Sequence, residues 1–169
     1  MAPTRTDMPT TWDERATLTT FLAYTRATAL TKCEGLTDAQ SRATPIATSP
    51  IMSIAGVVNH LRWVEHSWID TQFLGGEDLG PWTDEEPDRE FTIVSELPLR
   101  QIIAEYVEQS ARLDAIVADL DLDAMAARPR RSGVHVSLRW VLHHLIEETA
   151  RHNGHLDILR ELVDGTVGD

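Results

Sequence analysis

The sequence predicts an all-α fold, an up-down four-helix bundle with a long loop between its second and third helices. Four long segments repeat apolar residues at helical spacing, and the joints between them hold most of the prolines and glycines. No segment has a convincing strand pattern, since the only candidate, residues 134–136, is too short. A chain of 169 residues has the size of one domain, which we expect over residues 11–165 after a flexible N-terminus at residues 1–10.

The first two helices have recognisable ends. We expect the first over about residues 13–34, because Thr11 and Glu14 have capping-box spacing and Gly35 is a natural stop. The second is expected over about residues 53–74 and is followed by two glycines. Its apolar stripe consists of Ile54, Val57, Leu61, Val64 and Trp68.

The second half of the chain begins with an acidic loop over about residues 75–96. A loop of this length is often a lid or a binding segment, and a plain surface cover is the equal alternative. The third helix is expected over about residues 98–120, with a proline in its first turn. The fourth is expected over about residues 137–163, with Ser137 as its N-cap and Gly165 after its end.

Composition excludes several classes of protein. The net charge of −12, with one short basic cluster at residues 128–131, argues against a nucleic-acid partner. No apolar run reaches the roughly 18 residues of a membrane span, and no apolar stretch near the start indicates a secretory signal. The single cysteine, Cys33, excludes an intrachain disulfide and a cysteine-based zinc cluster. We therefore expect a cytoplasmic protein with no membrane partner.

Six of the seven histidines, all but His135, lie on the second and fourth helices. At about 100° per residue, His152 points to the middle of the apolar face of the fourth helix, with Glu148 beside it. These two residues are one turn apart, with Cβ atoms about 5–6 Å from each other, so both can reach one ion. On the second helix His60 borders the apolar stripe, whereas His66 faces away. The pattern predicts a metal site formed by His60, Glu148 and His152.

The same residues have a purely structural interpretation. Glu148 and His152 can be a buried pair whose members satisfy each other, because an unpaired buried carboxylate is unfavourable. His155, one turn beyond His152, is either a partly exposed residue, an outer partner of the site or an alternative ligand, and the same holds for His144. The sequence assigns no catalytic residue and no residue that binds an organic cofactor.

Two segments carry a resemblance to a known family. Residues 57–68 (VVNHLRWVEHSW) and 143–162 (HHLIEETARHNGHLDILREL) resemble the DinB superfamily, and more narrowly an actinobacterial branch of it. The resemblance covers about residues 10–165. It implies a DinB-like four-helix bundle, often a homodimer, with a divalent metal held by one ligand from the second helix and two from the fourth. By motif these ligands are His60, Glu148 and His152.

The resemblance also implies a chemistry. Many members have histidine where this chain has Glu148, while relatives similar to the mycothiol-dependent maleylpyruvate isomerase have glutamate there. Two histidines and one carboxylate suit zinc with an open position, with nickel or iron as alternatives. We therefore expect a metal-dependent enzyme that acts on a small molecule and uses a thiol such as mycothiol for S-transfer or isomerisation. The alternatives are a hydrolase with a metal-activated water, with His155 or His144 as base, and a non-catalytic metal-binding stress or interaction module.

Overall fold

A computed structural model describes residues 5–130 and 132–168, so residues 1–4 of the expected flexible N-terminus lie outside the described residues. The predicted all-α bundle is confirmed, and the described residues contain only one isolated bridge, between Met125 and Ser137, and no strand. The elements, in chain order, are α1 (Glu14–Thr31), α2 (Asp38–Ser41), α3 (Ile54–Glu65), η1 (His66–Phe73), α4 (Arg89–Thr92), η2 (Ile93–Glu96), α5 (Leu99–Val117) and α6 (Leu138–Asp164).

The caps of the helices are mostly those that the sequence predicts. The Ser137 hydroxyl accepts a hydrogen bond from the backbone of Trp140 and starts α6, and Gly165, with φ of 78°, ends it. The predicted capping box at Thr11 is wrong. Asp13 is the N-cap of α1, and its carboxylate accepts from the Ala16 backbone N–H at 2.9 Å and from the Thr11 hydroxyl. The carboxylate thus takes the place that the hydroxyl was expected to fill.

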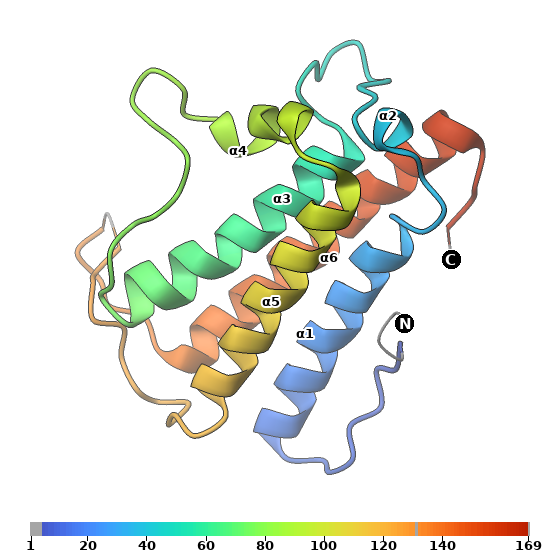
Figure 1. Ribbon diagram of the computed structural model, residues 1–169. Coiled ribbons are helices and arrows are strands. Elements are labelled where there is room, and N and C mark those ends of the chain that lie inside the picture. The colour runs from blue at the N-terminus through green and yellow to red at the C-terminus, as the bar shows by residue number, and fades with distance from the viewer. Residues whose placement is uncertain (1–4, 131, 169) are drawn as a thin grey trace.

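The four long helices run up, down, down and up, so the predicted bundle is present but the expected up-down alternation is interrupted between α3 and α5 (Figure 1). Two ion pairs show that α3, continued by η1, and α5 run in the same direction. Arg62 pairs with Glu105 at 2.6 Å, and further along both helices Asp70 pairs with Arg112 at 2.5 Å. These helices are therefore parallel neighbours. The long loop predicted between them returns the chain along the bundle before α5 begins (Figure 1).

The predicted loop over residues 75–96 is helical in its last third, where α4 and η2 pack against α3. The Asn59 side-chain amide donates a hydrogen bond of 2.6 Å to the backbone carbonyl of Glu90. Both residues are buried, so this bond fastens α4 to the middle of α3. The end of the loop is thus part of the packed structure.

The second predicted helix is one continuous rod with two geometries, because α3 passes directly into the π-helix η1. A π-helix closes its hydrogen bonds from i to i+5 and changes which side chains share a face. Its end matches the prediction, since Gly75, with φ of 76°, follows the last turn.

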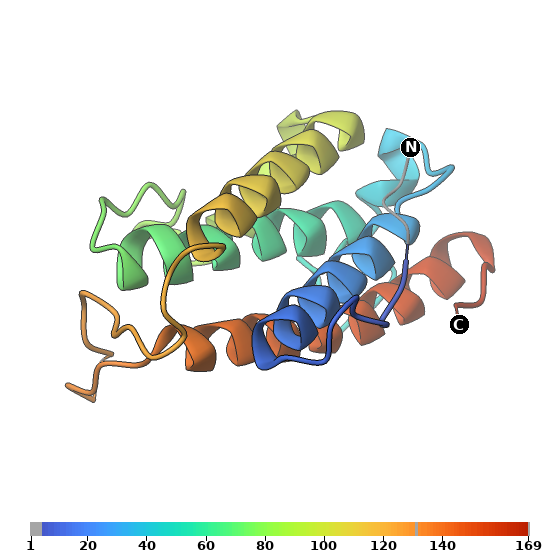
Figure 2. The ribbon, with the colours of Figure 1, turned by 90° about the horizontal axis from the view of Figure 1, so that it is seen from below.

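Two apolar clusters fill the two halves of the bundle, with α3 lying between α5 and α6 (Figure 2). A polar layer separates them. The Arg26 guanidinium contacts Glu65 and Asp114, each at 2.7 Å. Burial raises the pKa of the Glu65 carboxyl, while Arg26 beside it acts in the opposite direction. This layer makes the register of α1 against α3 and α5 specific.

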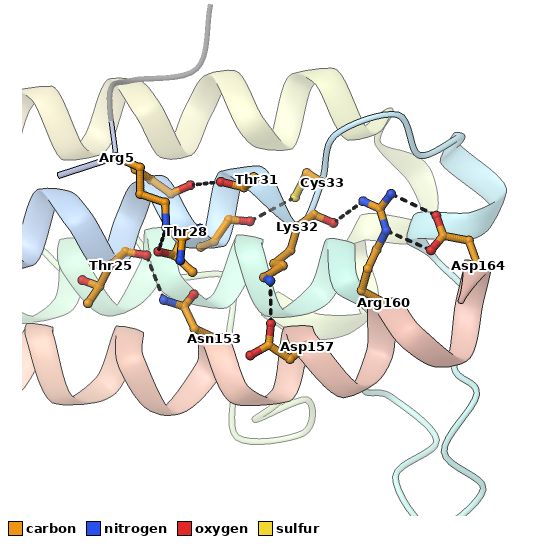
Figure 3. A network of polar contacts seen from close by, with 12 residues as sticks. Arg5, Thr25, Thr28, Thr31, Lys32, Cys33, Asn153, Asp157, Arg160 and Asp164 are labelled. Atoms are coloured by element: carbon orange, nitrogen blue, oxygen red, sulfur yellow. Dashed lines mark hydrogen bonds and ion pairs between the residues drawn. The ribbon is translucent and has the colours of Figure 1, made fainter. Parts of the chain in front are cut away.

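Polar contacts also fix α6 against α1 (Figure 3). The Lys32 ammonium lies 2.7 Å from Asp157, and the Asn153 amide donates a hydrogen bond of 2.9 Å to the Thr25 carbonyl (Figure 3). Arg160 donates to the Lys32 carbonyl at 2.9 Å. The pairs advance together along both helices, so α1 and α6 are parallel, and both run antiparallel to α3.

Candidate metal site

The antiparallel packing of α3 and α6 brings His60, Glu148 and His152 together. Glu148 Oε1 lies 3.8 Å from His60 Nε2 and 3.6 Å from His152 Nε2, and the three ligand atoms all lie within 4.8 Å of one another. Ligand atoms around a tetrahedral ion with bonds of about 2.1 Å lie about 3.4 Å apart. The donor set therefore fits a divalent ion if the side chains move by about one ångström or less.

His60 has a carboxylate on its other ring nitrogen. Its Nδ1 lies 3.4 Å from Glu90 Oε1, and its ring stacks on Phe91 with 4.7 Å between centroids. A proton on Nδ1 that is donated to Glu90 leaves the Nε2 lone pair facing Glu148. Carboxylate partners of this kind orient metal-binding histidines. Glu90 and Phe91 were missed by the sequence analysis, in which nothing but the acidic character of the loop pointed to them.

His152 is neutral at physiological pH. Burial, and then the neighbouring His60, lower the pKa of its imidazole to about 4. Its Nδ1 lies 3.3 Å from His155 Nδ1, so a proton between these two atoms again leaves Nε2 directed at Glu148. His155 thus contacts the candidate ligand His152 but is not one of the three side chains that converge.

The other histidines fall into two sets. His144 forms a second group of potential ligands with Glu147 and Glu148, and its ring packs at 4.6 Å from that of Trp68. Burial lowers the pKa of its imidazole. The remaining three lie away from the candidate metal site, with ring nitrogens against Asp70, a backbone carbonyl of α6 and the Ala126 carbonyl; they are His66, His143 and His135.

A small apolar hollow of about 190 Å³ opens beside His152. Its walls come from the segment before α3, from α3 itself and from α4, and they consist of Ser49, Ile51, Met52, Val57, Phe91 and His152. An apolar group of a few carbon atoms fits a space of this size next to the candidate metal site.

The chain's own thiol is unsuited to chemistry at this site. Cys33 is buried in the apolar cluster at the end of α1, and burial raises the pKa of its thiol to about 12. The thiolate is the nucleophilic form of cysteine, so Cys33 stays protonated and unreactive. Sulfur chemistry at this site therefore needs a thiol that comes from outside the chain.

These features define a DinB-like helical bundle with a candidate two-histidine, one-carboxylate metal site at the seam of α3 and α6. The family model for mycothiol-S-transferase matches residues 17–165, and the chain belongs to that family. This match confirms the predicted DinB-like relationship and the predicted use of a low-molecular-weight thiol. A search of curated proteins finds no match. Among the described residues, no helix has the length and apolar character needed to cross a membrane.

Proposed function

We propose that this mycothiol S-transferase depends on a divalent metal held by His60, Glu148 and His152, and that it transfers the thiol to a small electrophilic molecule. The observation that carries the proposal is the convergence of the three side chains from two antiparallel helices onto one point. Two imidazoles and one carboxylate would hold a divalent ion and leave room on it for a bound thiol. Zinc suits this set, with nickel or iron as alternatives.

A divalent ion held by these residues would lower the pKa of a bound thiol, so that a thiolate would exist at neutral pH. The neighbouring residues set the orientation and protonation of the ligands. Glu90 and His155 orient the two imidazoles, and the neutral state of His152 keeps its lone pair available. Because Cys33 is buried and protonated, it does not compete for the electrophile.

The apolar hollow next to His152 is the place we assign to the acceptor molecule. Its apolar lining by Ile51, Met52 and Phe91 favours a small apolar or aromatic group. A molecule held there lies against one of the candidate ligands, so its electrophilic atom is near the sulfur. Holding two reactants in this way supplies much of the rate gain of a transferase.

Elemental analysis of the purified protein tests the metal site. We expect one equivalent of metal in the wild type and loss of it in His152→Ala, while His143→Ala, which removes an exposed histidine of the same helix, keeps it. Conjugation of an electrophile is then followed with and without mycothiol. A metal content in His152→Ala equal to that of the wild type contradicts the assignment of ligands, and turnover that ignores the thiol favours the hydrolase alternative.

A homodimer and a cytoplasmic location, both expected from the sequence, stay predictions. Sedimentation equilibrium of the purified chain tests the first, and fractionation of the source cells tests the second.

The non-catalytic interpretation predicts a closed four-ligand site. His144 and Glu147 are the residues near Glu148 that could complete such a site. Neither takes part in the hydrogen bonds of His60 to Glu90 or of His152 to His155.

A further inference from the structure

A second hollow of about 930 Å³ lies at the other end of the same helical seam. It is polar and open, in contrast to the small apolar hollow beside His152. Its lining comes from η1 and from the loop before α6, and it consists of Ser67, Trp68, Gln72, Pro129, Arg130 and Ser132. Nothing in the site described above uses these residues.

A continuous chain of contacts joins this hollow to the candidate metal site. A ring nitrogen of His144 lies within 4.8 Å of a carboxylate oxygen of Glu148. The His144 ring lies 4.6 Å from that of Trp68 and is stacked at 5.1 Å on Trp140. Because His144 and Glu148 are one turn apart on α6, His144 lies about 6 Å along the seam from the nearest metal ligand, and the tryptophans pack against its ring.

Arg130 covers these tryptophans. Its guanidinium carbon lies 5.5 Å from the centroid of Trp68 and 4.9 Å from that of Trp140. Among the residues that the structure describes, no carboxylate forms an ion pair with Arg130. Arg130 is exposed, so a guanidinium held over the two rings still has N–H donors available to a ligand.

The π-helix sets the other side of the hollow. In an α-helix, Ser67 and Gln72 would be about 140° apart around the axis. In a π-helix residues i and i+5 lie about one turn apart, so Ser67 and Gln72 share one side of η1. Both line the hollow together with Trp68. Neutral hydroxyl and amide groups thus surround an aromatic surface, which is an arrangement that suits a ring with many hydroxyl groups.

We propose that this hollow binds the sugar and cyclitol rings of mycothiol, with Trp68 against a ring face and Gln72 and Arg130 on the hydroxyl groups. The inference rests on the proposed function. Mycothiol carries its cysteine thiol through an amide on an amino sugar joined to inositol. About five bonds separate the sulfur from the first ring, an extended reach of about 6 Å. A sulfur at His60, Glu148 and His152 therefore brings that ring past His144 to the near edge of Trp68, and the inositol ring beyond it into the hollow.

The first test is binding of the thiol-free saccharide, glucosaminyl-inositol, followed by tryptophan fluorescence of the metal-free protein. We expect saturable binding that Arg130→Ala and Gln72→Ala each weaken about tenfold, the loss of one hydrogen bond to a charged or well-oriented group. Arg100→Ala, which removes an exposed arginine of α5, is the matched control and is expected to bind like the wild type. No saccharide binding, or equal binding by all variants, overturns the assignment.

The second test compares mycothiol with N-acetylcysteine as the thiol donor. We expect the preference for mycothiol, as the ratio of the two kcat/KM values, to fall about tenfold in Arg130→Ala. An unaltered ratio overturns the proposed subsite. Failure of the proposed function is distinguishable, because a wild type inactive with either thiol refutes S-transfer while saccharide binding is still measured directly.

Discussion

Replacement of Glu90 is the sharpest test of how the candidate metal site is built. Glu90 is 7% exposed, its Oε1 lies 3.4 Å from His60 Nδ1, and its Oε2 has no hydrogen-bond partner among the described residues. Loss of the carboxylate frees the His60 ring to rotate and to exchange its proton between the two nitrogens. Such outer partners of metal ligands typically contribute 10–100-fold in affinity, about 1.4–2.7 kcal/mol.

The assay is a competition for metal between the protein and a chelating indicator. We expect about a tenfold weaker metal affinity for Glu90→Gln, which keeps an acceptor oxygen but no charge, and about a hundredfold weaker affinity for Glu90→Ala. Glu85→Gln, an exposed change in the same loop, is the control. The reasoning fails if Glu90→Ala folds, as judged by circular dichroism, and binds metal as tightly as the wild type.

Further predictions concern the buried ion pair of the core, the reactivity of Cys33, the stability of the protein in acid and the N-cap of α6. Glu65→Ala leaves Arg26 buried with half its pairing, so urea unfolding should show a loss of about 3–5 kcal/mol; a loss below 1 kcal/mol contradicts the buried pair. Cys33 should resist a thiol reagent until the protein unfolds, and fast labelling of the native state refutes its assigned burial. His152 has a folded pKa of about 4 against about 6.5 when unfolded, so the unfolded state binds more protons between these values. The metal-free protein should therefore lose stability as the pH falls from about 6.5 to about 4, and His152→Gln should flatten that dependence. Ser137→Ala should lower stability by about 1 kcal/mol in thermal unfolding, and no change would remove its role as N-cap.

Features decided within one or two helical turns were predictable from the sequence. The Ser137 cap, the Gly165 end and the pairing of Glu148 with His152 depend only on spacing along one helix. The choice of His60 over His66 rested on its place beside the apolar stripe of the second helix. The structure brings these three side chains together, while metal binding by them stays a prediction.

Features decided by contacts distant in the sequence were not predictable. Glu90 reaches His60 because α4 packs on α3, where Asn59 bonds to the Glu90 carbonyl, and no periodicity in the acidic loop indicates that packing. The π-helix η1 has the apolar spacing of an ordinary helix. At the start of α1, Thr11 and Asp13 are both good caps, and only the backbone path selects the second. The parallel course of α3 and α5 depends on how far the loop at residues 75–88 carries the chain.

The direction of the candidate metal ligands on α6 depends on a residue that is not itself a candidate ligand. Asn153 directly follows His152, and its amide donates to the Thr25 carbonyl of α1. Successive helical residues differ by about 100° around the axis, so a bond that holds Asn153 toward α1 leaves His152 turned toward α3. The buried Thr149 follows Glu148 in the same way. One face of α6 is thus anchored in the bundle, and the adjacent face is free to carry the metal ligands and, further along, the aromatic floor of the proposed saccharide site.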